Sequence, residues 1–318
     1  MKVLAIAINT FKEAVRNRVL YVLLFFSVLI MFGAWVASTL SIDDETKIVR
    51  DLGIGAINFI SVLIAVFVGI GLVYNDLDKK TIYTIVSKPI HRWQFLLGKY
   101  FGLLLTIAVN VLFMTWIFAG VMHFRDSVSG ANVMKAVFAV NDMGAYEYKG
   151  VLYHYGYYAY SLGRAMLLAT WHIVSMGLDG YHITSGLFTS SLLTILEMAI
   201  ITAFAILFSC FSSPTLSAFL TVIVFIIGRL VEDLYLFADT IVNRAGGLDN
   251  LTAGQQMSYY LAIAAAHFSP NLSVFDQRSA IAEFATVRLT GLDIAYAFVY
   301  TALVMFVAII VFNRRNFK

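Results

Sequence analysis

Long apolar segments alternate with shorter polar ones along the chain, and six of them are long enough to cross a membrane. A helix of about 22 residues, at a rise of ~1.5 Å per residue, spans a hydrocarbon core of ~30 Å. The apolar runs are continuous, whereas a transmembrane barrel would have segments of roughly ten residues with alternating polarity. The predicted spans are approximately Val19–Leu40, Leu52–Tyr74, Tyr100–Met122, Leu187–Phe211, Thr215–Phe237 and Leu292–Phe312.

The composition indicates that lipid is the solvent for much of this chain. Hydrophobic residues make up 60% of the 318 residues and charged residues only 13%, against about 25% charged in an ordinary soluble domain. So few charges leave too little polar surface to cover a water-soluble globule. The sequence therefore predicts an all-α polytopic membrane protein, with residues 1–318 forming a single transmembrane domain.

Residues 1–18, ahead of the first span, predict an amphipathic helix at the membrane surface. Apolar side chains recur at helical spacing, and polar side chains occupy the opposite side. The apolar set is Leu4, Ile8, Phe11 and Val15, and the polar set is Asn9, Lys12, Glu13 and Arg16. Such a helix lies with its apolar face in the interface. Alternatively, the segment extends the first span into the cytoplasm.

The positions of the basic residues predict the orientation of the spans. With the N-terminus inside, twelve of the 22 lysines and arginines fall in a few short inner segments, as the positive-inside rule requires. Both termini are then cytoplasmic, in a bacterial or archaeal inner membrane. Two long segments, 123–186 and 238–290, lie outside. Within the first of them, Ala159 to Leu178 is interpreted as an amphipathic helix on the outer face.

The polar stretch 75–99, between the second and third spans, reads NDLDKKTIYTIVSKPIHRWQFLLGK. It resembles the first coupling region of type 2 ATP-binding-cassette permeases, in which an acidic residue precedes T-I/L, then S/T-K/R-P-I/V-x-R, then G-K. The matching residues are Asp76, Thr81, Ser87, Lys88, Pro89, Arg92, Gly98 and Lys99. Asp76 stands where many relatives have Glu, and His91 where Ser or Thr is commoner.

Other parts of the chain resemble one subgroup of these permeases, associated with multicopper-enzyme maturation and including the permease linked to nitrous oxide reductase assembly. The resemblance rests on NTFKEAVRNRVLYVLLFF at the start, FSCFSSP from Phe208, Ile227-Gly228-Arg229, and the residues from Phe268 to Leu272 with Phe275. It covers most of the chain outside 123–186. It implies the type 2 exporter permease fold, with short re-entrant helices within 238–290.

The resemblance also implies partners. ATP and Mg would be bound by two separate cytoplasmic ATPase subunits, and the permease would pair with a second copy of itself or a similar chain. The chain has no G-x-x-x-x-G-K-[ST] phosphate loop, so we expect it to hold no cofactor and to have no catalytic residues or enzyme activity of its own. Within 75–99, a short amphipathic helix with a proline start signal and a basic rim would suit docking into a groove on a partner. Its apolar contacts would come from Ile82, Ile85, Val86 and Ile90. Alternatively, this is only an inside loop made basic by topology.

Two charged residues fall inside predicted spans on either side of the tight turn near Pro214. Glu197 and Arg229 lie about equally far from that turn along their helices and hence at similar depth. A lone charge at mid-membrane costs roughly 3 kcal/mol, so such groups face the bundle and pair. The sequence predicts a Glu197–Arg229 ion pair, with two roles open: fixing the helical hairpin, or lining a polar substrate path.

Five of the six histidines fall in outer segments, with methionines nearby, which raises a copper site for this subgroup. These histidines are His123, His154, His172, His182 and His267. No H-x-x-x-H or M-x-x-M spacing occurs, and interleaved tyrosines fit interfacial anchoring equally well. The sequence therefore predicts no metal site, and it has no basic patch for nucleic acid.

The leading functional prediction is a permease subunit that couples ATP hydrolysis by its partner to movement of a substrate, in the direction of export. A second hypothesis is a force-transmitting membrane component that moves no substrate and docks an extracytoplasmic protein at 123–186. A third is an ATP-independent transporter or channel. Sparse intramembrane charge and the lack of inverted repeats disfavour the third.

Overall fold

The computed structural model describes residues 2–39, 45–72, 91–128, 182–276 and 289–314, and all regular structure in these residues is helical. The α-helices are α1 (Lys2–Val15), α2 (Arg18–Thr39), α3 (Glu45–Leu63), α6 (Arg92–Val128), α9 (His182–Ser209), α10 (Pro214–Arg229), α11 (Val231–Ala245), α12 (Ala253–Phe268) and α14 (Gly291–Arg314). The shorter elements are the π-helix η1 (Ile64–Val68) and the 3-10 helices η2 (Leu248–Asn250) and η3 (Ser273–Phe275). The all-helical prediction is confirmed for this part of the chain.

Five helical segments are long and apolar enough to cross a membrane, and the bent pair α10–α11 would make a sixth. The five segments are Arg18–Ala37, Lys47–Leu72, Arg92–Met122, Gly186–Ser209 and Gly291–Arg314. By length and composition, the chain is a multi-pass integral membrane protein. The first four predicted spans and the last correspond to these five segments.

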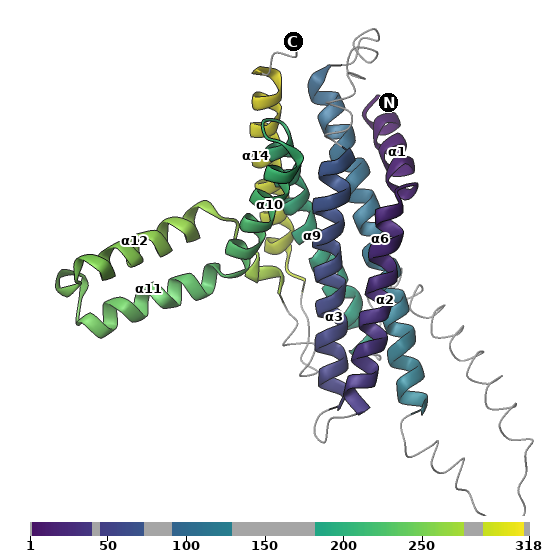
Figure 1. The fold of residues 1–318 in the computed structure, drawn as a ribbon, viewed down its shortest axis with the longest axis horizontal. Helices are drawn as coiled ribbons and strands as arrows, with labels where there is room; N and C mark the ends of the chain where they lie inside the picture. Colours follow the sequence, from purple (N-terminus) through teal and green to yellow (C-terminus); the bar gives the residue numbers. More distant parts are fainter. Residues whose placement is uncertain (1, 40–44, 73–90, 129–181, 277–288, 315–318) are drawn as a thin grey trace, which may run out of the picture.

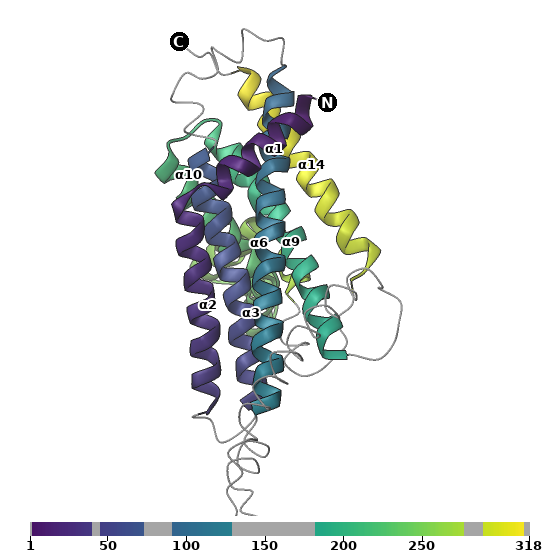
Figure 2. The same ribbon diagram turned by 90° about the vertical axis from the view of Figure 1, so that its right-hand side faces the viewer.

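The spanning helices lie side by side in one bundle, with α3 and α9 at its centre (Figures 1 and 2). In the most apolar window of each span, 78% of the residues of the α3 segment and 67% of those of α9 are buried, against 22% for α2 and 28% for α14. The large side chains of α2 and α14 therefore face outward, where lipid would cover them. The central helices carry the core and most of the buried polar groups.

Helix α6 is longer than the third span that the sequence predicts. It begins at Arg92 rather than near Tyr100 and continues to Val128, 37 residues in all. The last part of the stretch 75–99 is helical in the structure. Its apolar side chains Phe95 and Leu96 are buried in the core. Arg92, Gly98 and Lys99 consequently occupy the first turns of α6.

The fifth predicted span, Thr215–Phe237, is wrong as a single straight helix. The chain bends by 59° between α10 and α11, and Leu230 between them has φ −95° and ψ 5°, outside regular helix. Helix α10 does begin at the predicted turn, with Pro214 in its first helical position, where proline is favoured. No proline marks the bend in the sequence.

Both ends of the predicted outer segment 123–186 belong to spanning helices in the structure. Helix α6 extends to Val128, and α9 begins at His182. Residues 129–181, with the predicted amphipathic helix at 159–178, lie outside the described residues. The second predicted outer segment, 238–290, contains the end of α11 and all of α12. These two helices project sideways from the bundle (Figure 1).

Candidate functional site

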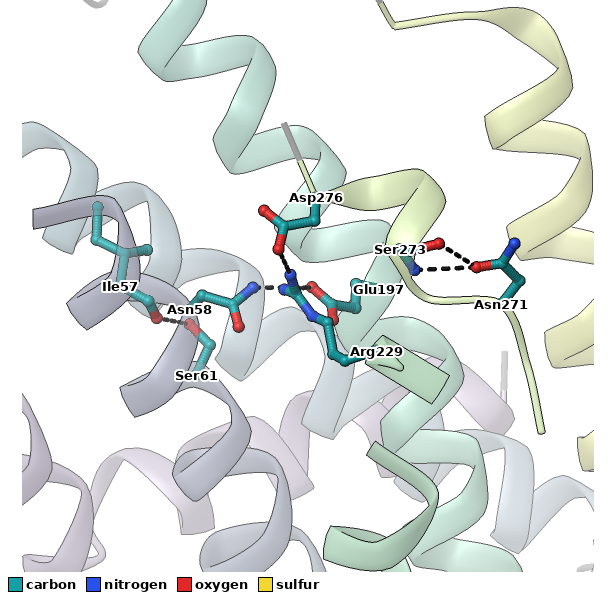
Figure 3. Close-up of polar contacts among 8 residues, drawn as sticks. All are labelled: Ile57, Asn58, Ser61, Glu197, Arg229, Asn271, Ser273 and Asp276. Carbon is teal, nitrogen blue, oxygen red and sulfur yellow. Dashed lines mark hydrogen bonds and ion pairs between the residues drawn. The ribbon is translucent and has the colours of Figure 1, made fainter. Parts of the chain in front are cut away.

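A network of charged and polar side chains joins three helices and one loop in the middle of the bundle (Figure 3). It contains Asn58 from α3, Glu197 from α9, Arg229 at the end of α10, and Asp276 just after η3. Glu197 lies close to the centre of the apolar segment Gly186–Ser209. The network therefore lies at mid-depth of the spanning bundle.

Arg229 is the centre of this network. It donates two parallel hydrogen bonds to Glu197, from Nε to Oε1 and from Nη2 to Oε2, each 2.7 Å long. Its Nη1 donates to Oδ2 of Asp276. Asn58 Nδ2 donates to Glu197 Oε2 at 2.8 Å. One guanidinium is thus shared by two carboxylates, in the two-pronged geometry that gives arginine–carboxylate pairs their strength.

The arrangement favours a structural role for the ion pair over a substrate path. The Glu197 side chain has no exposed surface, and that of Arg229 is only 12% exposed. Both Glu197 oxygens accept hydrogen bonds from protein groups, which leaves the carboxylate engaged with the protein. A buried pair satisfied in this way fixes the relative positions of the helices that carry it.

Tight backbone packing places Asp276 beside Arg229. The backbone N–H of Leu272 donates to the carbonyl of Gly228 at 2.9 Å, and a Cβ built on Gly228 would lie 2.8 Å from Leu272 side-chain atoms and from the Pro270 carbonyl. Only glycine leaves room for this approach. The loop is held on its other side by the Tyr296 hydroxyl, which accepts from the backbone N–H of Asn271 at 2.8 Å.

Sequence reasoning missed Asn58 and Asp276. Asn58 is one of several polar residues in an apolar span, and nothing in its spacing points to α9. Asp276 follows the Phe268–Leu272 motif, which marked this loop through the family resemblance alone. Both residues reach the network through contacts distant in the sequence, 139 positions for Asn58 with Glu197 and 47 for Asp276 with Arg229.

A second candidate site is the end of the bundle at which α1, the start of α6 and the end of α14 meet (Figure 2). We call it the terminal end, because the first described residue, Lys2, and the last, Arg314, belong to the helices that meet there. Five of the residues predicted to couple to an ATPase lie outside the described residues: Asp76, Thr81, Ser87, Lys88 and Pro89. The structure brings the other three, Arg92, Gly98 and Lys99, together in the first two turns of α6.

Helix α1 is clamped onto the start of α6. Lys99 Nζ lies 3.2 Å from Glu13 Oε2, and the Lys99 side chain is 3% exposed. A Cβ on Gly98 would lie 2.6 Å from Ile6 side-chain atoms, and one on Gly102 would lie 2.6 Å from the Ala7 carbonyl oxygen. The two glycines therefore allow the close helix approach typical of a G-x-x-x-G pair.

The face of α1 that packs on protein is not the apolar stripe found in the sequence. The buried residues are small, Ala7, Thr10 and Ala14, and they face α6. Leu4 and Ile8 of the stripe remain 65% and 43% exposed. The first half of the stripe is thus left free for a membrane surface, as an interfacial helix requires, whereas Phe11 and Val15 are half-buried.

Helix α14 reaches the same place from the other side. Arg92 Nη1 donates to the backbone carbonyl of Asn313 at 3.1 Å, and the rings of Phe95 and Phe312 stack with centroids 6.3 Å apart. Phe312 is 2% exposed. The first turns of α6 thus contact both α1 and α14.

Replacing Gly102 with leucine should detach α1 from α6. The new side chain would meet the Ala7 backbone, which cannot move without moving the whole helix. We expect the free energy of unfolding to fall by about 1–3 kcal/mol. Ala14, which is fully buried, reports the displacement when it is changed to cysteine, because a maleimide should label it faster in the Gly102→Leu background.

Gly33→Leu is the control, because nothing lies within 4 Å of a Cβ at that position. It should leave labelling at position 14 unchanged. Slow labelling in both backgrounds would mean that α1 adjusts to the larger side chain without leaving α6. The buried native thiol of Cys210 should stay unlabelled throughout.

Among the described residues, no group of three or more His, Cys, Asp or Glu side chains could hold a metal ion. His154 and His172 lie outside the described residues. His267, in α12, contacts Tyr235 through Nδ1 at 3.4 Å. A scan against protein-family models and a search of curated proteins both find no match for this chain.

Proposed function

We propose that the chain is the membrane-spanning permease subunit of an ATP-binding-cassette transporter of the type 2 exporter class. A separate cytoplasmic ATPase would bind ATP and Mg, and its motion would drive a substrate across the inner membrane, in the direction of export. The permease would act with a second copy of itself or a close relative. Both termini would be cytoplasmic.

The observation that carries the proposal is the placement of Arg92, Gly98 and Lys99. These residues end the coupling pattern in 75–99, and they lie where α6 contacts both α1 and α14. A push on the segment 75–99 would therefore pass directly into three helices at once. Packed helices transmit such a displacement as rigid bodies, because close-packed interiors do not absorb it.

The buried network at mid-depth fits the same role. It ties α3, α9 and α10 together, so that these helices would move as a unit when α6 is displaced. In this proposal Glu197 and Arg229 set the geometry of the moving part and do not carry the substrate.

Purification of the tagged chain in mild detergent tests the proposal. We expect a protein with a Walker-type phosphate loop to accompany it, at about one copy per permease. Pro89→Ala and Arg92→Ala variants should each lose most of this partner or its permease-dependent ATPase activity, roughly tenfold or more. Gln256→Ala is the control, because Gln256 is exposed on α12, which projects from the side of the bundle (Figure 1).

The result would go against the proposal if both variants retained the partner and full ATP-driven activity. Recovery of the chain with only outer-face proteins would favour the force-transmitting alternative. Transport in vesicles without an ATPase would favour the passive carrier.

A further inference from the structure

Helices α11 and α12 form an antiparallel hairpin that stands away from the bundle (Figure 1). The turn uses Gly246 and Gly247, which have φ values of 74° and 135°, in the region that favours glycine. A capping box between Thr252 and Gln255 starts α12. The hairpin buries mostly small side chains, including Ala238, Ala262 and Ala266. It is a well-formed element with little core of its own.

The outer surface of the hairpin suits neither water nor hydrocarbon. Large apolar side chains are widely exposed, among them Leu236 at 64%, Met257 at 66% and Tyr260 at 66%. Charged side chains are exposed on the same element, including Glu232 and Asp233 in the first turn of α11. A charge facing the bilayer interior costs about 3 kcal/mol on insertion scales. An apolar patch of this kind in water marks an interaction site.

The depth at which the hairpin leaves the bundle strengthens this conflict. Helix α11 begins two residues after Arg229, which is paired with Glu197 near the middle of the α9 span. Helix α10, with 16 residues, is about 24 Å long, shorter than a ~30 Å hydrocarbon core. The hairpin therefore starts within the depth of the spanning bundle, where only protein can cover both its apolar and its charged side chains.

One face of α11 has the pattern of a helix–helix seam. Asp233, Phe237, Thr240 and Arg244 are exposed and follow one another at spacings of four, three and four residues, which places them in one stripe along the helix. Phe237 is 50% exposed, and Leu236 beside it adds apolar surface. The stripe has an acidic end, an apolar centre and a basic end.

This seam is complementary to the same seam of a second copy in antiparallel orientation. Asp233 would face Arg244 of a second copy, and Phe237 would face Thr240 of that copy. Both pairings are centred between residues 238 and 239, so a single two-fold axis satisfies them all. Each ion pair is then formed twice, once at each end of a seam about 17 Å long. Self-complementarity of this kind is what a two-fold dimer interface requires.

We propose that α11 is a dimerisation arm that packs antiparallel against α11 of a second copy of this chain, along Asp233, Phe237, Thr240 and Arg244. The inference rests on the proposed function for a permease that works in pairs, and it adds the surface through which the copies meet. The apolar centre excludes water, and the charged ends fix the register and reject a parallel arrangement.

Cysteine cross-linking between differently tagged copies in native membranes tests the register. A copy with Phe237→Cys and a copy with Thr240→Cys should form a disulfide on mild oxidation, because the two positions face each other across the seam. A copy with Gln256→Cys, exposed on α12, should not cross-link to Thr240→Cys. The native Cys210 is buried and serves as an internal control.

Charge reversal tests the complementarity. Asp233→Arg and Arg244→Asp should each lower the cross-linking yield about tenfold or more, because each places like charges opposite each other at both ends of the seam. The two reversals combined in one chain should restore the yield. Both residues are exposed, so the thermal midpoint of each purified variant should match that of the parent.

Failure of the Phe237–Thr240 cross-link, or a yield that the reversals do not change, would overturn the self-pairing of α11. An arm that only inserts into the membrane interface would give that result. The test uses no ATP and no ATPase. A missing ATPase partner with normal cross-linking would therefore defeat the proposed function alone, and the opposite result would defeat the dimerisation arm alone.

Discussion

Replacing Arg229 with methionine is expected to lower the free energy of unfolding by about 3–5 kcal/mol, the range measured when one partner of a buried ion pair is removed. Methionine keeps much of the apolar stem but removes all three donors to Glu197 and Asp276. Two carboxylates are then left without their shared cation, and that of Glu197 is fully buried. The unfolding midpoint in a mild detergent titrated with a denaturing one would measure the loss.

Substitution of the other partner should cost less. Glu197→Gln removes a charge but leaves Arg229 with Asp276, so that one cation still faces one anion. Asn58 can still donate to the new amide oxygen. We expect a loss of about 1–2 kcal/mol for this variant. The asymmetry follows directly from one guanidinium serving two carboxylates.

The double variant Arg229→Met with Glu197→Gln provides the critical comparison. If the two residues act as a pair, its loss should be smaller than the sum of the single losses by about 1–3 kcal/mol. Arg229→Lys should fall between the parent and Arg229→Met, because an ammonium keeps the charge without the two-pronged geometry. Additive losses would mean that the two residues stabilise the bundle independently and that the network does not pin α10 to α9.

The Glu197–Arg229 contact could be predicted from the sequence because of where the turn lies. Two helices joined by a few residues at Pro214 must run antiparallel, so equal distances from the turn mean equal depth. A charged residue at that depth in each helix has few alternatives to pairing with the other. The structure places the two side chains 2.7 Å apart.

The rest of the network could not be found in this way. Asn58 and Asp276 approach through packing between elements that are far apart in the sequence, and no periodic signal records which helices become neighbours. The bend after Arg229 was hidden for the same reason. The sequence IIGRLVEDLYLF carries no proline. At the bend, the carbonyl of Gly228 accepts a hydrogen bond from the backbone N–H of Leu272, a residue far along the chain.

The charged residues at the start of α11 did not reveal the structure there, in contrast to Glu197 and Arg229. Glu232 and Asp233 lie within the predicted fifth span, Thr215–Phe237, although charges usually mark where a helix leaves the membrane. In the structure they begin a new helix, α11, that turns away from the bundle. Their position was informative, but composition cannot distinguish a helix that exits the membrane from one that bends.

At the terminal end, three residues selected through the family resemblance, Arg92, Gly98 and Lys99, lie close together in α6. Gly98 and Lys99 lie in α6. Gly98 allows the close approach of α1, and Lys99 forms an ion pair with Glu13. Spacing alone could assign Gly98 and Gly102 to helix packing but could not name the partner helix. That partner is a short helix which no span prediction includes.

Replacing Gly53 with alanine should lower the free energy of unfolding, even though it adds only one methyl group. A Cβ at this position in α3 would lie 2.0 Å from Cε2 of Phe118 in α6. The Phe118 ring is fully buried, so displacing it would disturb the side chains packed around it. We expect the free energy of unfolding to fall by about 1–3 kcal/mol for Gly53→Ala. For Phe118→Ala, which leaves a cavity, it should fall by about 3–5 kcal/mol.

A matched pair of variants decides whether this contact sets the spacing of α3 and α6. Gly53→Ala combined with Phe118→Leu should lose less than the two single changes added together, because the smaller side chain makes room for the methyl group. Gly33→Ala in α2, with no atom within 4 Å of its Cβ, should be neutral or gain up to about 1 kcal/mol from helix propensity. If Gly53→Ala were as stable as Gly33→Ala, the spacing of α3 and α6 would not depend on this contact.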